Sequence, residues 1–345
     1  MKDITEAPFE DAETLGAPSR VANSPWVVMK FGGTSVSSPE RWETIATLLQ
    51  HRLESGLRPM VVHSALKGVS NKLAEVLDHA VGTDPAADLA AIREQHYDLA
   101  QGLGLDGPSM LDATFHELEQ LIAGVRLVRE VSIRVRVRIM ALGELAATRI
   151  GAAYLQSRSL PVRWADARDL LTSNERAQRQ TSNAWLSATC DFGPDESLRR
   201  KLAEDDAVVL TQGFIARNKN GETVLLGRGG SDTSAAYFAS KLEARRLEVW
   251  SDVPGMFTAD PRVVPSARLL VALHYDEAQE LASAGSSVLH PRCLKPVQLA
   301  GIPLFVRSTE APEIAGTVVS SITDEVEPQV KGICLRNGLT LVSMD

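Results

Sequence analysis

Several features that mark other protein classes are missing from this sequence. No stretch reaches the roughly 18 consecutive apolar residues that a membrane-spanning helix needs. Residues 1–20 are acidic and lack the apolar core of a secretory signal. The 345 residues include only three cysteines, at positions 190, 293 and 334. Their spacing suits neither a disulfide framework nor a zinc site, so we expect a reducing, cytoplasmic location.

Basic residues are in the minority. There are 36 lysines and arginines against 44 aspartates and glutamates, which gives a net charge of −8. This balance argues against a generally basic surface, although it is compatible with a local basic pocket, and we expect neither a nucleic-acid partner nor a membrane partner. The phosphate-binding pattern GxxxxGK[ST] is also absent, which excludes a P-loop NTPase.

The overall composition is typical of a globular protein, with 44% hydrophobic and 23% charged residues. Apolar runs alternate with segments of helical periodicity, which predicts an α/β fold whose sheet is covered on both faces. We expect residues 1–24 to be a flexible leader. Strands are predicted at 26–30, 60–63, 162–164, 207–211, 223–226, 247–250 and 304–306. Helices are predicted from Pro39 onward with Ser38 as N-cap, within 85–130, and at 231–241, 275–284 and 295–300. Residues 133–139 fit either type, and the helix-forming residues that follow favour a helix.

The first chemical motif is Lys30-Phe31-Gly32-Gly33-Thr34-Ser35, at the end of a predicted buried strand. Glycines let backbone N–H groups approach an anion closely, and the lysine adds a positive charge. The alternative is a simple strand-to-helix turn with a solvated lysine. The two interpretations are about equally supported by these residues alone.

A second glycine-rich motif, Leu226-Gly227-Arg228-Gly229-Gly230-Ser231-Asp232, again joins a strand to a helix. Ser231 or Asp232 is expected to cap that helix. Arg228 offers a planar fork for a carboxylate or phosphate, and Asp232 suits an ammonium group or a magnesium ion. A capped turn without a ligand is the alternative, but two such turns after two strands favour a ligand site.

Two further segments are less distinctive. Residues 250–262 follow a predicted strand, where an α/β sheet places its ligands, and Phe257 and Arg262 could contact a nucleotide there. Taken alone, the segment is more typical of a surface loop. Glu144, on a predicted helix, is by itself more typical of a solvated helix face.

Together these motifs resemble the aspartate kinases of the amino-acid-kinase superfamily. The resemblance runs in order through residues 26–320. It rests on KFGGTSV (30–36), SALKGVSN (64–71), GE (143–144), TQGFI (211–215), LGRGGSD (226–232), DVPG (252–255), DPR (260–262), VLHP (288–291) and GT (316–317). The combination of KFGGTS with GRGGSD is highly specific.

The resemblance implies a three-layer α/β/α sandwich with a mainly parallel sheet. It also implies transfer of the γ-phosphoryl group of MgATP to the side-chain carboxylate of L-aspartate, which gives 4-phospho-L-aspartate. That reaction opens lysine, threonine and methionine biosynthesis, through the diaminopimelate pathway for lysine. Enzymes of this kind are allosteric and cytoplasmic, and we expect a homo-oligomer. The cofactors implied are ATP and Mg²⁺, and no protein ligand of the metal is assigned.

The resemblance also assigns roles to individual residues. It implies catalytic roles for Lys30 and Asp232, and a phosphate path along Gly32, Gly33 and Ser35. The aspartate pocket would comprise Ser70, Glu144, Phe214, Arg228 and Ser231, with Asp232 sharing the ammonium group. The nucleotide side would comprise Ser251, Asp252, Phe257, Arg262 and Ser287.

Two positions depart from the family pattern. Ser287 stands where many members have a lysine that contacts the nucleotide, and Ser251 replaces a common threonine but keeps the hydroxyl. Two other functions stay open: another amino-acid or carbamate kinase of the superfamily, or a non-catalytic subunit that binds an effector. The intact Lys30 and Asp232 argue against the second alternative.

The expected division is a leader at 1–24, a catalytic domain at 25–320 and a linker with a regulatory stub at 321–345. Residues 330–335 and 339–344 resemble the first hairpin of an ACT regulatory domain. Two strands cannot bury a core alone, so we expect either a truncated domain, with the chain a fragment of a longer or bifunctional enzyme, or a stub that pairs with another element.

Overall fold

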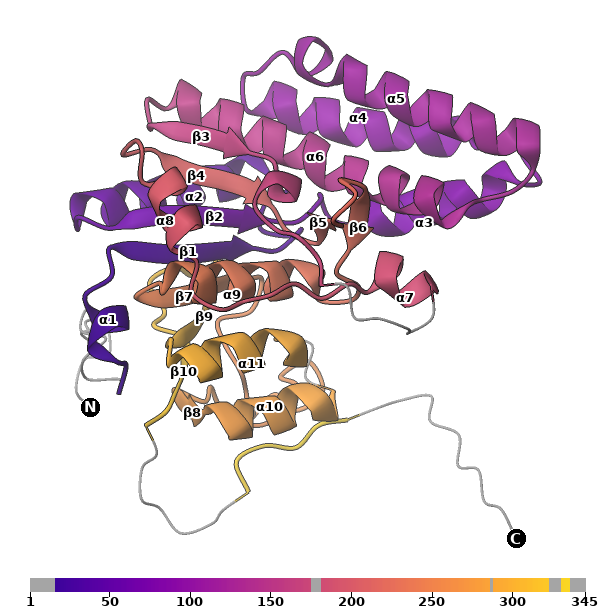
Figure 1. Ribbon diagram of the computed structural model, residues 1–345. Helices are drawn as coiled ribbons and strands as arrows, with labels where there is room; N and C mark the ends of the chain where they lie inside the picture. Colours follow the sequence, from indigo (N-terminus) through magenta and orange to yellow (C-terminus); the bar gives the residue numbers. More distant parts are fainter. Residues whose placement is uncertain (1–15, 175–180, 286–287, 323–329, 336–345) are drawn as a thin grey trace, which may run out of the picture.

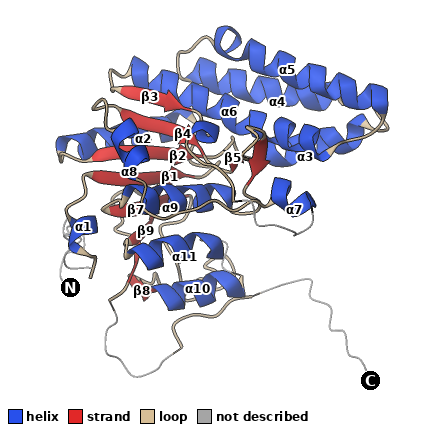
Figure 2. Ribbon diagram, in the orientation of Figure 1, coloured by secondary structure: helices blue, strands red, loops and turns tan. Residues whose placement is uncertain are grey.

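The fold is built on one eight-stranded sheet with helices on both faces (Figures 1 and 2). The structure is a computed structural model that describes residues 16–174, 181–285, 288–322 and 330–335. The strands are β1 (Trp26–Phe31), β2 (Arg58–His63), β3 (Val162–Ala165), β4 (Val208–Gln212), β5 (Ile215–Arg217), β6 (Thr223–Leu225), β7 (Arg246–Ser251), β8 (Ala272–His274), β9 (Leu304–Ser308) and β10 (Thr317–Ser320). The helices are α1 (Ser19–Ala22), α2 (Pro39–Glu54), α3 (Val69–Ala80), α4 (Ala86–Gly102), α5 (Gly107–Val128), α6 (Ile133–Ser157), the 3-10 helix η3 (Ala167–Asp169), α7 (Thr181–Leu186), α8 (Glu196–Leu202), α9 (Gly230–Leu242), α10 (Tyr275–Ala284) and α11 (Pro291–Ala300).

Alternate side chains of each central strand enter two separate hydrophobic cores. In β1, Val27 and Met29 pack with α2, α3, α5 and α6, whereas Trp26 and Val28 pack with the side that holds α9 and α11. A strand buried on both faces must be apolar at almost every position, which is why β1 and β2 read as continuous apolar runs. The predicted α/β/α sandwich is confirmed.

The strand order is β3-β4-β2-β1-β7-β9-β10-β8. All pairings in this eight-stranded sheet are parallel except β9 with β10, which is antiparallel. The chain runs outward from β1 in one direction through β2 and β4, and in the other through β7 and β9. The carboxyl ends of β1 and β7 therefore flank the switch point at which α/β sheets hold their ligands.

Most predicted elements are confirmed. Residues 133–139 are helical, because they begin α6, and the hydroxyl of Ser132 accepts from the N–H of Val135 at 3.3 Å at its start. Ser38 is the N-cap residue of α2 and Pro39 its first residue, although the Ser38 side chain makes no capping hydrogen bond. The predicted strand at 223–226 forms as β6, but it pairs with β5 in a separate two-stranded sheet.

Some predictions were wrong. The N-cap of α9 is Gly229, at φ 64°, whereas Ser231 and Asp232 lie inside the first turn. Helix α11 begins at Pro291, four residues before the predicted start. Residues 330–335, predicted as a strand, form neither helix nor strand, and residues 339–344 lie outside the described residues.

Packed structure also begins inside the predicted leader. Helix α1 buries Val21 completely, and the hydroxyl of Ser321 donates to the carbonyl oxygen of Gly16 at 3.4 Å. Pro18 packs against Gly301, at the end of α11. The start of the described chain therefore lies against residues that follow β10. Among the described residues, no helix is both long and apolar enough to cross a membrane.

Candidate active site

Two pockets open near the carboxyl ends of β1 and β7. The first, which we call the acid–base pocket, has a volume of about 280 Å³. It is lined by Lys30, Ser64, Ser70, Glu144, Phe214, Gly227, Arg228, Gly229, Gly230, Ser231 and Asp232. These residues come from β1, the segments after β2, β4 and β6, and helices α3, α6 and α9. The topology thus brings all the residues predicted for the aspartate pocket together with both predicted catalytic residues.

A buried ion pair lies at the base of this pocket. The Nζ of Lys30, on β1, lies 2.6 Å from Oδ1 of Asp232, and each side chain is only 12% exposed. Lys30 is fixed by the β1 ladder between β2 and β7, and Asp232 by the first turn of α9. The pair places a positive and a negative charge side by side in a space that water enters little.

Glu144 contributes a second carboxyl group from the middle of α6. It is 2% exposed, and Oε1 accepts from the N–H of Ala65 at 3.4 Å. Oε2 is buried and accepts from no described residue. Burial raises the pKa of Glu144 to about 8, an effect only partly offset by the hydrogen bond from Ala65. An orphaned buried carboxylate oxygen of this kind needs a cationic or donor partner.

Residues 227–230, which we call the glycine turn, include Arg228, a positively charged residue of the pocket. Arg228 is exposed and has no ion pair with any residue in the described ranges. Gly229 adopts the left-handed region, and the first turn of α9 starts directly after it. The pocket therefore has an unpaired guanidinium on one side and a buried carboxyl group on the other.

The remaining predicted residues of this pocket are held by short polar contacts. Phe214 has φ 68°, unusual for a residue with a side chain. Its N–H donates to the hydroxyl of Ser234 at 2.9 Å, which stabilises that conformation. The hydroxyl of Ser64 donates to that of Ser231 at 2.9 Å. Ser70 lies in the first turn of α3.

The three residues predicted for the phosphate path are not among those that line the acid–base pocket. Gly33 lies so close to the loop after β2 that a Cβ there would be 2.8 Å from the carbonyl oxygen of Ala65. Gly32 follows β1 directly, beside the Lys30 Nζ. Ser35 is fully buried, and its hydroxyl accepts from the Thr309 hydroxyl at 3.0 Å. Its side chain is thus committed inside the protein, and a phosphate role for these residues stays a prediction.

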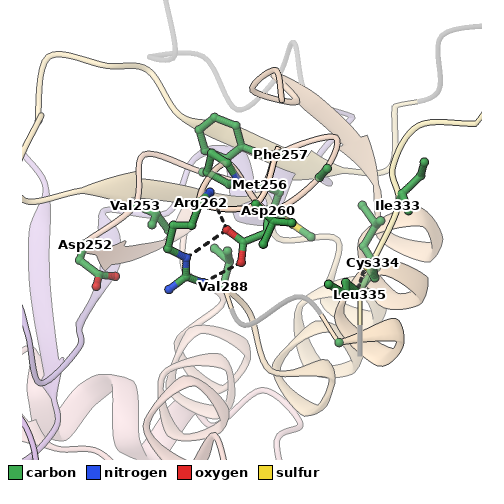
Figure 3. Close-up of a pocket in the computed structure, with 16 residues that line it drawn as sticks. Asp252, Val253, Met256, Phe257, Asp260, Arg262, Val288, Ile333, Cys334 and Leu335 are labelled. Carbon is green, nitrogen blue, oxygen red and sulfur yellow. Dashed lines mark hydrogen bonds and ion pairs between the residues drawn. The ribbon is translucent and has the colours of Figure 1, made fainter. Parts of the chain in front are cut away.

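The second pocket, about 290 Å³, lies beyond the end of β7 (Figure 3). We call it the loop pocket because residues 252–263 supply most of its wall. Phe257 and Asp252 line it, as does Arg262, whose guanidinium forms a two-point ion pair with Asp260 at 3.0 Å. The hydrogen bonds of Arg262 to Asp260 lower the pKa of that aspartate. Ser251 is not among the lining residues and donates to Asp252 at 3.0 Å.

A segment far along the chain closes the other end of the loop pocket. Ile333, Cys334 and Leu335 lie opposite Asp252 and Arg262 in Figure 3. The N–H of Ile333 donates to the carbonyl oxygen of Thr258 at 2.8 Å. No pattern of residue types in 330–335 predicted a place beside the loop pocket. The predicted nucleotide contact Ser287 lies outside the described residues.

No group of three or more His, Cys, Asp or Glu side chains within the described ranges could hold a metal ion by itself. Magnesium dehydrates reluctantly and is commonly held by one or two carboxylates together with substrate phosphates. Asp232 and Asp252, which line the two pockets, are carboxylates of the kind that fits this mode.

Residues 25–308 match the Amino acid kinase family, so the chain belongs to that family. It is similar to lysine-sensitive aspartokinase 3 of Escherichia coli, at 32% identity over 92% of this chain and 69% of that protein. It is also similar to aspartokinase 1, chloroplastic, of Arabidopsis thaliana, at 31% identity over 99% of this chain and 60% of that protein.

A solved structure agrees with the sequence relatives. The crystal structure of E. coli aspartokinase III in complex with aspartate and ADP matches with a TM-score of 0.75 and 32% identity, over 87% of this chain and 65% of that chain. The predicted resemblance to aspartate kinases is confirmed. The chain spans between 60% and 69% of the length of these relatives.

Proposed function

We propose that this protein is an ATP-dependent aspartate kinase, which phosphorylates the side-chain carboxylate of L-aspartate. The observation that carries the proposal is the charge arrangement in the acid–base pocket. Unpaired Arg228 and the orphaned oxygen of Glu144 complement the α-carboxylate and α-ammonium groups of an amino acid. Lys30 then remains for a second anionic group, the side-chain carboxylate or the transferred phosphoryl group. A substrate with two carboxylates and one ammonium group suits all three.

The proposed mechanism relies on positioning rather than on a strong base. The attacking carboxylate is already ionised near pH 7, so no proton has to be removed from it. The difficulty is to bring it against the triphosphate and to stabilise the charge on the phosphoryl oxygens. Lys30 supplies positive charge at that point, and Asp232 holds the lysine in place. Glu144 and Arg228 orient the amino acid from opposite ends.

We assign the nucleotide to the loop pocket, with Phe257 against apolar parts and Asp252 and Arg262 at its polar end. Three considerations support this assignment: the pocket's volume, its place after β7, and the aspartokinase structure in complex with aspartate and ADP. When bound, Mg²⁺ would neutralise phosphate charge, with Asp232 or Asp252 as a carboxylate ligand. The phosphate path along Gly32 and Gly33 belongs to the same proposal.

The family resemblance supports three wider proposals. Residues 25–320 form the catalytic domain. The product, 4-phospho-L-aspartate, enters lysine, threonine and methionine biosynthesis. The protein acts as a homo-oligomer.

A coupled assay of ADP formation tests the proposed function. The protein is given MgATP with L-aspartate, L-glutamate, N-acetyl-L-glutamate or carbamate in parallel. We expect ADP formation that depends on aspartate. Turnover only with another acceptor would identify a different kinase of the family, and no turnover with any acceptor would favour a non-catalytic subunit.

A further inference from the structure

Arg292, in the first turn of α11, connects three parts of the chain. Its Nη1 donates to the carbonyl oxygen of Leu226, and its Nη2 donates to that of Ala188 at 3.0 Å. Nη1 also donates to the hydroxyl of Ser187 at 3.4 Å. One guanidinium therefore connects α11 to the segment that directly follows α7 and to the segment that directly follows β6.

The carbonyl group of Leu226 directly precedes the glycine turn. Gly227 has φ 77° and Gly229 has φ 64°. The carbonyl oxygen of Gly229 accepts from the N–H of Thr233 at 2.9 Å, so α9 anchors the end of the turn, whereas Arg292 contacts its start through the carbonyl oxygen of Leu226. A Cβ on Gly227 would lie 3.3 Å from Nη1 of Arg292, and one on Gly229 would lie 2.1 Å from Cγ of His290. One side of the turn therefore packs against His290 and Arg292 at the start of α11, and the turn also lines the acid–base pocket.

We propose that Arg292 is a positioning residue for the amino-acid substrate, an inference that rests on the proposed function. Arg292 does not line the acid–base pocket, so it acts through the glycine turn and sets the place of Arg228. A guanidinium suits this task because its planar fork donates to two carbonyl oxygens at once, whereas a lysine ammonium is a point donor. Losing it would leave the carbonyl of Leu226 without its side-chain donor and let the turn move.

The main test replaces Arg292 by methionine, which keeps the apolar stem and removes the fork. We expect the KM for aspartate to rise about tenfold, the equivalent of one charge-assisted hydrogen bond. The kcat and the KM for ATP should change less than about threefold. Arg163→Met is the matched control, because Arg163 also donates to a backbone carbonyl, that of Leu202 at 3.2 Å, but lies on the edge strand β3. An equal rise in both KM values, or an effect as large in Arg163→Met, would overturn the proposal.

Combining Arg292→Met with Arg228→Ala tests whether Arg292 acts on aspartate binding through Arg228 or through the general stability of the fold. If Arg292 acts through Arg228, then Arg292→Met should raise the aspartate KM less than about twofold in an Arg228→Ala background. The same tenfold effect in both backgrounds would mean that Arg292 does not act through Arg228, and the proposal would be wrong.

Hydrogen exchange measures the turn without turnover. Peptides covering the glycine turn should exchange faster in Arg292→Met, with Arg292→Lys in between, while peptides from β1 and β2 keep the rates of the parent protein. Unchanged exchange in the turn would overturn the proposal. Because this measurement needs no activity, a parent protein that fails to phosphorylate aspartate would refute the proposed function without deciding the role of Arg292.

Discussion

Lys30 and Asp232 neutralise each other at the point where two anions are proposed to meet. The 2.6 Å contact between Nζ and Oδ1 pairs the lysine with a carboxylate in a space with little water. A ligand phosphate or carboxylate must therefore compete with Asp232 for that ammonium group.

Substitution of Lys30 by methionine tests this role directly. We expect kcat to fall by about 10²–10³-fold, because a preorganised charge stabiliser is lost from the transition state. Steady-state ADP formation with saturating aspartate and ATP measures the effect. Lys201→Met, on an exposed position of α8, serves as the control and should leave kcat unchanged. A Lys30→Met protein that turns over like the parent would contradict the mechanism.

Glu144 should make aspartate binding depend on pH. Burial raises its pKa to about 8, so near pH 7 the carboxyl group is mostly protonated and must lose its proton to pair with an ammonium group. We therefore expect the aspartate KM to fall as the pH rises from 6 to 8.5. Glu144→Gln should bind aspartate weakly at every pH, with a flat profile. A wild-type KM that does not change over this range would be the contrary result.

The same carboxyl group should lower stability at high pH. Its pKa is about 8 when folded and near 4.5 when unfolded, so the folded state holds an extra proton between these values. The stability contribution is fully present below pH 4.5 and is lost as the pH rises towards 8. Urea unfolding should show Glu144→Gln to be more stable than the parent at pH 8.5, with the difference shrinking towards pH 5. A difference that grows on acidification would show that Glu144 is ionised in the folded protein.

At the level of elements, β7 carries a buried carboxylate that links this strand to α2 and to the neighbouring strand β9. Glu248 is 1% exposed and accepts from Nε of Arg52 at 3.0 Å and Nε of Arg246 at 2.7 Å. Burial alone would raise the pKa of Glu248, but the charges of Arg52, Arg246 and Arg307 outweigh it and lower the pKa to about 2. β7, at the switch point, is thus stabilised by these buried ion pairs as well as by its backbone hydrogen bonds to β1 and β9.

Neutralising Glu248 should therefore destabilise the fold. Glu248→Gln leaves the arginines around it without their counter-charge, and we expect a loss of about 3–5 kcal/mol at pH 7 in urea unfolding. The loss should shrink as the pH falls from 4.5 towards 2, where the parent carboxylate also becomes protonated. Glu280→Gln, at an exposed position of α10, should leave stability within about 0.5 kcal/mol of the parent. A Glu248→Gln protein as stable as the parent would contradict this role.

Elements with strong local patterns were predictable from sequence, and those that depend on a partner were not. Helices such as α10 show their apolar spacing in the sequence, and the buried strands show continuous apolar runs. β5, β8 and β10 span only three or four residues each, and their pairing partners lie elsewhere in the chain. Gly229 was missed as the N-cap of α9 because Ser231 and Asp232 are the more usual capping types.

At the scale of the molecule, the acid–base pocket was predictable because its residues lie in sequence motifs that resemble those of the aspartate kinases. Residue types alone gave no reason to bring Glu144 of α6 to Arg228, since a lone glutamate on a helix is typical of an exposed face. For the loop pocket, the wall formed by residues 252–263 was predictable, but the wall formed by Ile333–Leu335 was not. The sequence pattern of 330–335 suggested a strand and did not place Ile333–Leu335 at this pocket, because their position depends on where the chain passes after β10.

The contact between Gly16 and Ser321 brings the start of the described chain beside the end of β10, the last strand of the sheet, whereas residues 330–335 lie against the loop pocket. Chains whose ends meet tolerate circular permutation, because closing the ring then needs only a short linker. We expect a permutant that joins residue 322 to residue 16 through about five residues, opened between the exposed Gly82 and Thr83, to unfold cooperatively near the melting temperature of the parent. Opening the glycine turn instead should abolish that transition. The fold would then not depend on where the chain begins and ends. A permutant opened at Gly82 that fails to fold, or one opened at the glycine turn that still folds, would contradict this expectation.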